Sequence, residues 1–264
     1  MAMKEKDVPR DVITRLTVSS RYVGPPNVAN GGYICGLMAG FIDGPADVMI
    51  RMPTPVDYEL QVFAEGDGSY LLQDGEKIIV RAKPASLELE VPPPPDFQEA
   101  REAATTSIAL QNSPYPGWNT RGIHPLCFCC GADGADEQGM KIHPGKINGS
   151  NLVAAPWIPG PELGDEEGYV RPEFIWTALD CPGAFAFLEL SEHRPGMSGR
   201  IIGHLSGSLR VGDPSVVIAW PVRVEGRKLF AGTAVYNSAR QLIGRALATW
   251  ISLPSDSPLL KTSE

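Results

Sequence analysis

The sequence predicts an α+β protein made of two similar units, each an antiparallel sheet wrapped around one central helix. Two segments with matched spacing carry this prediction, residues 30–39 (NGGYICGLMA) and 171–180 (RPEFIWTALD), because they look like the same helix written twice. Runs with strand character follow each segment. With 264 residues, the chain is long enough for two units of about 100 to 130 residues each.

Composition indicates a packed globular protein, with 43% hydrophobic and 20% charged residues. The net charge of −8 disfavours a nucleic-acid partner, which normally meets a basic face. No apolar run approaches the roughly 18 residues of a membrane span, and the charged N-terminus lacks the apolar core of a secretory signal. Five cysteines, an odd number, are expected as free thiols, which predicts a cytoplasmic protein.

The first unit is expected over residues 1–92. Residues 12–20 alternate apolar and polar side chains as in a half-buried strand, and residues 24–27 predict a turn. A helix is expected over residues 31–41, and it should be enclosed because its residues are apolar or small nearly all round. Further strands are expected at 48–51, 58–64, 70–72 and 77–83. Asp74-Gly75 joins the last two, as is typical of a type I′ hairpin turn.

Prolines at 92–95 mark the boundary between the units. Residues 93–145 are expected to hold a linker helix over 96–109, capped by Asp96, and a connection rich in cysteine and glycine. The second unit, residues 146–264, repeats the pattern of the first. It predicts a strand at 152–157, a helix over 172–190, and strands at 201–211, 215–224, 229–236 and 241–252.

A mostly apolar helix wrapped by about five antiparallel strands, occurring twice, resembles the hotdog fold in its tandem, or double-hotdog, form. Three motifs carry the resemblance: Asn30-Gly31-Gly32, Leu179-Asp180, and Cys127-Phe-Cys-Cys-Gly131 followed by Gln138-Gly139-Met140. The third is similar to a connecting segment of many acyl-CoA thioesterase-like hotdog proteins. The resemblance spans residues 12–253 and implies an acyl-CoA thioesterase, which hydrolyses an acyl thioester to a free acid and a thiol.

Thioester hydrolysis needs donors aimed at the developing oxyanion and a group that attacks the carbonyl carbon or activates water. A helix N-terminus offers unpaired N–H groups, and glycine lets a substrate approach them. The resemblance implies that the amides of Gly31 or Gly32 polarise the thioester and that Asp180 of the partner unit is the base or nucleophile. Asn30 stands where this family has a histidine.

The second helix start, Arg171-Pro172-Glu173, has lost the glycines, and proline has no N–H to donate. One active site per chain is therefore expected. Ser206 or Ser208, on the strand after the second helix, could support Asp180. The acyl chain is expected in an apolar tunnel between the helices, lined by residues such as Met38, Phe41, Trp176 and Phe185.

Other interpretations of these residues stay open. Asp180 could simply end a helix, because Pro182 follows. The glycine pair could be a packing contact. A non-catalytic acyl-CoA or lipid-binding hotdog protein would bury the same acyl chain, and a hydratase would need an imidazole beside the acid, with His193 and His204 as candidates.

No metal or other cofactor is expected. Cys127, Cys130, His124 and His143 could close a tetrahedral zinc site, but the second Cys-x-x-Cys of a zinc ribbon is absent from the sequence. Cys35 and Cys181 lie in core helices and are interpreted as small apolar fillers. The expected partner is an acyl-CoA or acyl-carrier substrate, and association of sheets could give a homo-oligomer.

Overall fold

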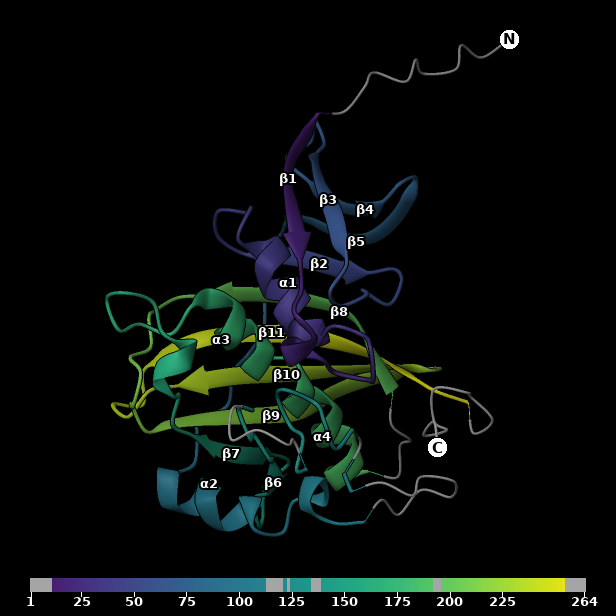
Figure 1. The fold of residues 1–264 in the computed structure, drawn as a ribbon. Coiled ribbons are helices and arrows are strands. Elements are labelled where there is room, and N and C mark those ends of the chain that lie inside the picture. Colours follow the sequence, from purple (N-terminus) through teal and green to yellow (C-terminus); the bar gives the residue numbers. More distant parts are fainter. Residues whose placement is uncertain (1–10, 113–120, 123, 134–138, 192–195, 255–264) are drawn as a thin grey trace.

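Within the described part of the chain, eleven strands form one antiparallel sheet in the order β1-β3-β4-β5-β2-β8-β11-β10-β9-β7-β6 (Figure 1). This computed structural model describes residues 11–112, 121–122, 124–133, 139–191 and 196–254. The first half of the sheet contains β1 (Val12–Thr17), β2 (Ala46–Ile50), β3 (Glu59–Ala64), β4 (Tyr70–Asp74) and β5 (Lys77–Pro84). The second half contains β6 (Gly145–Lys146), β7 (Val153–Trp157), β8 (Gly196–Leu205), β9 (Ser215–Glu225), β10 (Lys228–Tyr236) and β11 (Leu242–Ser252).

Both halves of the sheet repeat one strand order. Read inward from the outer edge, the first half runs first, third, fourth, fifth and second strand. The series β7-β9-β10-β11-β8 has the same order, with β6 added outside it. The halves join where Ala46–Met49 of β2 pairs with 200–203 of β8. At this junction Arg200 donates from Nε and Nη2 to the Asp47 carboxylate at 2.6 and 2.7 Å, and Asp47 is only 4% exposed.

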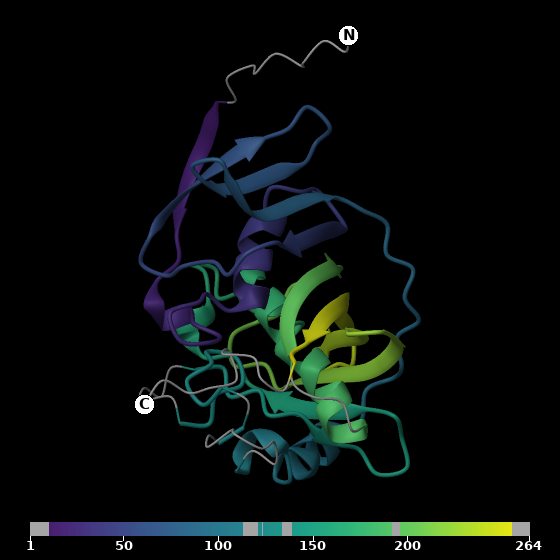
Figure 2. The ribbon, with the colours of Figure 1, turned by 90° about the vertical axis from the view of Figure 1, so that its right-hand side faces the viewer.

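Four α-helices lie among the described residues: α1 (Gly31–Ala39), α2 (Phe97–Ala104), α3 (Pro172–Ala178) and α4 (Cys181–Leu190). Short 3-10 helices occupy Ser20–Tyr22, Ile108–Leu110 and Pro161–Leu163. Helix α1 packs on β2, β5 and β8, and α4 packs on β7, β9 and β10. Figures 1 and 2 show α1 and α4 held in the concave side of the sheet, with α2 beyond β6 and β7. None of these helices is long and apolar enough to span a membrane.

The single helix expected over residues 172–190 is wrong, because the chain breaks it into α3 and α4 at Leu179 and Asp180. The ring of Pro182 disfavours helical continuity, since proline lacks an N–H and crowds the preceding turn. The break frees the carbonyl of Leu179, which accepts the hydroxyl of Thr233 at 2.7 Å. Asp180 therefore lies at the corner between two buried helices.

The strand expected over residues 201–211 also differs from the structure. It begins at Gly196 and ends at Leu205, because the N–H groups of Ser206 and Gly207 both donate to the carbonyl of Ile243 and end the regular ladder. The linker helix begins as predicted, with Asp96 Oδ1 accepting the Glu99 N–H at 2.7 Å. It ends earlier than expected, at Ala104.

Helices α1 and α3 run antiparallel in close contact through two glycines. A Cβ added at Gly36 would lie 2.6 Å from Glu173 Cα, and one added at Gly32 would lie 2.6 Å from Trp176 O. Real Cβ atoms need more room than this. The two glycines therefore let the backbones approach closely, which brings the start of α1 to the end of α3.

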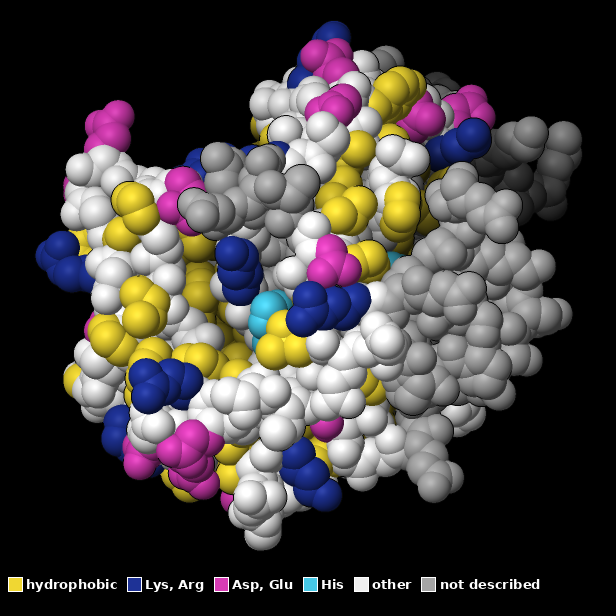
Figure 3. All heavy atoms as spheres, turned by 60° about the horizontal axis from the view of Figure 1, so that its bottom comes forward, with side chains coloured by type: hydrophobic (Ala, Val, Ile, Leu, Met, Phe, Trp, Pro, Cys, Tyr) yellow, Lys and Arg dark blue, Asp and Glu magenta, His cyan; other side chains and the backbone are white. Residues whose placement is uncertain are grey.

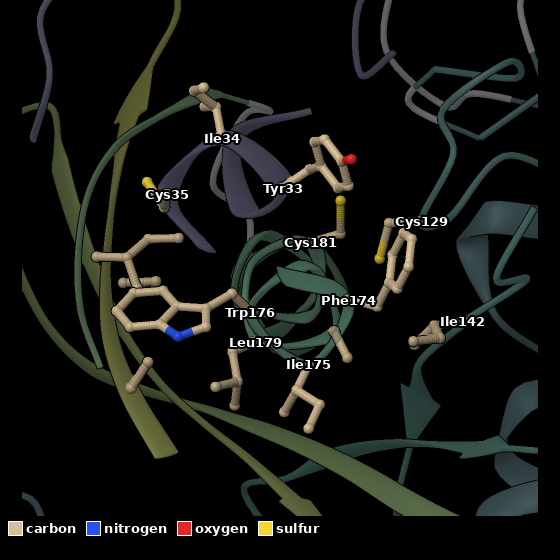
Figure 4. Close-up of a cluster of buried hydrophobic side chains, with 14 of the residues drawn as sticks. Tyr33, Ile34, Cys35, Cys129, Ile142, Phe174, Ile175, Trp176, Leu179 and Cys181 are labelled. Atoms are coloured by element: carbon tan, nitrogen blue, oxygen red, sulfur yellow. The ribbon is translucent and has the colours of Figure 1, made fainter. Parts of the chain in front are cut away.

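An aromatic cluster attaches the cysteine-rich connection to these helices. Phe128 packs edge-on against Tyr22 at 4.9 Å between ring centroids, and lies 5.8 Å from Phe174. The Phe128 N–H also donates to the carbonyl of Val23 at 2.8 Å. Figure 4 shows Phe174 and Cys129 on one side of α3 and Trp176 on the opposite side, toward the strands. The connection thus forms one wall of the region where the helices meet.

Charged side chains are dispersed over the face drawn in Figure 3. Lysine and arginine side chains there alternate with aspartate and glutamate rather than gathering in one basic patch. The described residues of this face therefore form no extended positive surface of the kind that a phosphate backbone needs.

Candidate functional site

The start of α1 leaves one backbone N–H free. Asn30 caps the helix, its Oδ1 accepting the Tyr33 N–H at 3.1 Å, and its carbonyl accepts the Ile34 N–H. The Gly32 N–H donates to Asp180 Oδ2 at 2.7 Å. Among the described residues, no group accepts the Gly31 N–H. The two glycines considered from the sequence therefore differ, since Gly32 holds the acid and Gly31 remains available as a donor.

Asp180 is 1% exposed. Burial raises the pKa of its carboxyl well above the ordinary value, and the charge of Cys181 adds to the increase. The Ser198 hydroxyl and the Gly32 N–H act in the opposite direction on this pKa. Asp180 Oδ1 and Ser198 Oγ are both buried without a well-formed hydrogen bond in the described part of the chain. Buried polar atoms of this kind need a partner, which a substrate or a water can supply.

These groups face one cavity of about 280 Å³. Gly31, Asp180 and Ser198 contribute to its wall. The rest of the wall is mostly apolar and includes Ile34, Ile50, Phe185, Met197, Trp250 and Ile251. A mostly apolar cavity with a few convergent polar groups is the usual form of a small-molecule site.

Of the four residues expected to line an acyl tunnel, only Phe185 reaches this cavity. Met38 is fully buried in the core. Phe41, which follows the C-terminal end of α1, stacks on Tyr70 at 5.2 Å between ring centroids. The ring of Trp176 fills the space above Gly203, where an added Cβ would approach it to 2.7 Å. The cavity lies at the start of α1 rather than along the contact between the helices.

Ser198, and neither Ser206 nor Ser208, accompanies Asp180. Ser206 Oγ donates to the Leu242 carbonyl at 3.1 Å, and Ser208 is exposed in a loop. Ser198 was not predicted from the sequence because its strand begins five residues before the predicted start at 201. The nearby glycines do not point to the acid either, since Cβ atoms added at Gly196 and Gly199 would meet Ile251 of β11.

Three buried thiols lie beside the same groups. The sulfur atoms of Cys127, Cys130 and Cys181 are all within 4.8 Å of one another. Asn30 Nδ2 donates to Cys127 Sγ at 3.6 Å and to Cys181 Sγ at 3.5 Å. Hydrogen bonds from Cys127 and the neighbouring thiols lower the pKa of Cys181 well below its usual range. Cys181 therefore belongs to a cluster of buried thiols, whereas its sequence context suggested a small apolar filler.

The histidines are distributed differently from the expectation. His124 lines the cavity, and burial lowers its pKa. His143 lies by the Gly131 carbonyl at 3.3 Å. His204 sits on β8 away from the cavity wall, and His193 lies outside the described residues. Among the described histidines, His124 is therefore the one whose imidazole shares the cavity wall with Asp180.

The start of α3 offers no equivalent donor site. Pro172 is its first residue, and no side chain caps the helix. Glu173 forms an ion pair with Arg171 at 3.6 Å, against the middle of α1. The cavity wall includes neither of these residues. The two helix starts are therefore chemically unlike.

A solved structure shares this architecture over nearly the whole chain. A putative thioesterase from Novosphingobium aromaticivorans aligns with 91% of this chain and 95% of its own length, at a TM-score of 0.57 and 10% sequence identity. The fold is a hotdog fold. Zebrafish thioesterase superfamily member 2 aligns with 45% of the hotdog chain and 90% of its own length, at a TM-score of 0.40 and 16% identity. Neither a protein-family model nor a curated protein sequence matches the chain.

Proposed function

We propose that this hotdog protein is a thioesterase that hydrolyses an acyl thioester at the composite site between α1 and the α3–α4 corner. One observation carries the proposal: the unused Gly31 N–H, the unsatisfied Asp180 Oδ1 and the unsatisfied Ser198 Oγ line the same apolar cavity. These are the groups that hydrolysis requires, a donor for an oxyanion and an acid–base carboxylate.

In the proposed reaction, the thioester carbonyl oxygen accepts the Gly31 N–H at the positive end of the α1 dipole. Asp180, held by the Gly32 N–H, takes a proton from a water while that water's oxygen attacks the carbonyl carbon. The tetrahedral intermediate collapses and the C–S bond breaks. The leaving thiolate takes the proton back from Asp180 and departs as a thiol. Water is consumed, and a free acid and a thiol are formed. Ser198 positions the carboxylate or the water.

The apolar wall suits the acyl part of the substrate, with Phe185 and Met197 limiting its length. Arg51 also lines the cavity and suits a phosphate-bearing thiol such as coenzyme A or an acyl-carrier arm. The repeated strand order and the unlike helix starts agree with two tandem hotdog units, residues 1–92 and 146–264, joined by residues 93–145 and sharing one active site. The five thiols, none in a disulfide, suit a cytoplasmic location.

The test is thiol release from short, medium, long and aromatic acyl-CoAs by the wild type and by Asp180→Asn. Asn can still accept the Gly32 N–H, so the variant should fold. Loss of a general base slows a reaction by about 10² to 10⁴-fold. Turnover by the wild type with a loss of this size in a folded variant supports the proposal. Binding of acyl-CoA without thiol release by the wild type would instead identify a non-catalytic binding protein.

One observation favours a second candidate, a hydratase: His124 and Asp180 line the same cavity, so an imidazole does accompany the acid. Hydration adds water across the double bond of an enoyl thioester and leaves the C–S bond intact. Incubation with an enoyl-CoA separates the two reactions. Loss of the conjugated double bond without thiol release indicates the hydratase, and thiol release indicates the thioesterase.

A further inference from the structure

We infer that Cys127, Cys130 and Cys181 bind a thiophilic divalent metal ion, with Zn²⁺ as the best match, beside the proposed active site. The sequence alone disfavoured zinc because only one Cys-x-x-Cys is present. The fold supplies the third thiol from α4, 54 residues after Cys127.

The spacing of the sulfur atoms suits tetrahedral coordination. Zinc–thiolate bonds of about 2.3 Å in a tetrahedron place the sulfurs about 3.8 Å apart. Cys127 Sγ and Cys181 Sγ are 3.8 Å apart, and Cys130 Sγ lies within 4.8 Å of both. A disulfide between any two of them would require the much shorter separation of about 2.05 Å. A shift of about 1 Å in one side chain would complete three zinc bonds.

The orientation of Asn30 indicates that these sulfurs act as acceptors. Its Oδ1 accepts the Tyr33 N–H, which fixes the amide so that Nδ2 faces Cys127 and Cys181. Donors around metal-bound thiolates orient the ligands and stabilise their charge. A buried amide such as that of Asn30, which donates to two sulfur atoms, is the environment expected around thiolates.

The backbone holds the Cys-x-x-Cys turn in one shape. The Gly131 N–H donates to the Cys127 carbonyl at 2.7 Å, and the Cys127 N–H donates to the His124 carbonyl at 3.0 Å. Gly131 has no room for a side chain, since an added Cβ would approach Cys127 O to 2.6 Å. A turn fixed in this way presents its two thiols without further ordering when a metal binds.

Charge also favours a cation at this place. The three thiols and the Asp180 carboxyl all line one cavity, so four groups that can carry negative charge converge there. Arg51 is the single lysine or arginine among the described residues of that wall. His124 lies on the same wall and is the candidate for the fourth ligand, since imidazole with thiolates is a common zinc set.

The test is Co²⁺ and Zn²⁺ binding to the full chain, kept reduced and free of metal at the start. We expect one metal per chain and, with Co²⁺, the sulfur-to-cobalt charge-transfer absorption and visible bands of a tetrahedral thiolate site. Cys181→Ser should lose most of that absorption. Cys129→Ser is the matched control and should keep it, because Cys129 is buried in the same turn but its thiol donates to the Thr177 carbonyl at 3.4 Å.

The inference is overturned if the reduced, folded wild type binds less than one metal per chain, or if bound Co²⁺ shows no sulfur charge transfer. Equal losses in Cys181→Ser and Cys129→Ser, with both folded, would also overturn it. If Cys181→Ser does not fold, the wild-type cobalt spectrum decides alone. None of these measurements uses catalytic activity, so a failed thioesterase assay and a failed metal site remain distinguishable.

Discussion

Replacing Gly36 by alanine should weaken both the fold and the active site. The new Cβ would meet Glu173 Cα at 2.6 Å and Trp176 Cβ at 2.8 Å, whereas ordinary contacts begin at 3.4 Å. Both neighbours belong to a packed helix, so α1 and α3 must separate by roughly 1 Å. Overpacking of this kind costs about 1 to 3 kcal/mol. Because the contact is with rigid backbone, we expect an overpacking cost near the upper value, about 3 kcal/mol. The higher helix propensity of alanine relative to glycine offsets about 1 kcal/mol of this cost.

A net loss of about 2 kcal/mol should lower the melting temperature by roughly 4 to 8 °C. Separation of the helices also moves Gly31 relative to Asp180, and a misplacement of about 1 Å can slow catalysis by roughly 100-fold. Thermal melting and thiol release measure the two effects. Gly66→Ala is the control, because no atom lies within 4 Å of its added Cβ. If Gly36→Ala has the same melting temperature as Gly66→Ala and the wild type, close packing at Gly36 is refuted.

Three further changes test other parts of the molecule. Arg200→Leu leaves the buried Asp47 carboxylate without its two charged hydrogen bonds, so the free energy of unfolding measured in urea should fall by about 1.5 to 3 kcal/mol. Arg15→Leu is the control at an exposed ion pair and should lower it by less than about 1 kcal/mol. Burial raises the pKa of Glu189, so the stability that this carboxyl contributes is fully present below its unfolded pKa and is lost as pH rises through its folded pKa. Glu189→Gln should therefore raise the melting temperature near neutral pH but not at about pH 4. Equal shifts in melting temperature at the two pH values would contradict this. Met197→Phe should shift thiol release toward shorter acyl-CoAs, and an unchanged preference would remove Met197 from the acyl site.

Much of the fold could be predicted because its determinants are local. Apolar and small residues all round residues 31–41 indicated a buried helix, which the structure has over Gly31–Ala39. Asp74-Gly75 indicated the β4–β5 hairpin, and the structure has this hairpin. The type I′ turn is wrong, however, because the two loop residues are Gly75 and Glu76 and only Gly75 has a positive φ. The matched spacing of the two helices also brought Gly32 and Asp180 onto facing elements, and the structure places them in contact.

The missed features depend on contacts between distant residues. Ser198 lies in a strand whose early start is fixed by pairing with β11, and no local pattern reveals that register. The break at Asp180 was considered from Pro182, but its stabilisation by Thr233 joins residues 54 positions apart. Cys181 meets the Cys-x-x-Cys turn only because α4 begins beside the connection, so spacing rules applied to the sequence could not find the cluster.

The unlike starts of α1 and α3 have a consequence for how such a site can change over time. In a symmetric dimer of identical chains, every substitution occurs twice, so a proline that removes a donor at one helix start removes it at both. Here the proline at 172 leaves Gly31 untouched. A chain that carries both helices can therefore vary one of them for packing alone while the other keeps its chemistry. Loss of a backbone donor should accordingly be tolerated at the start of α3, where Pro172 already lacks one, and not at the start of α1.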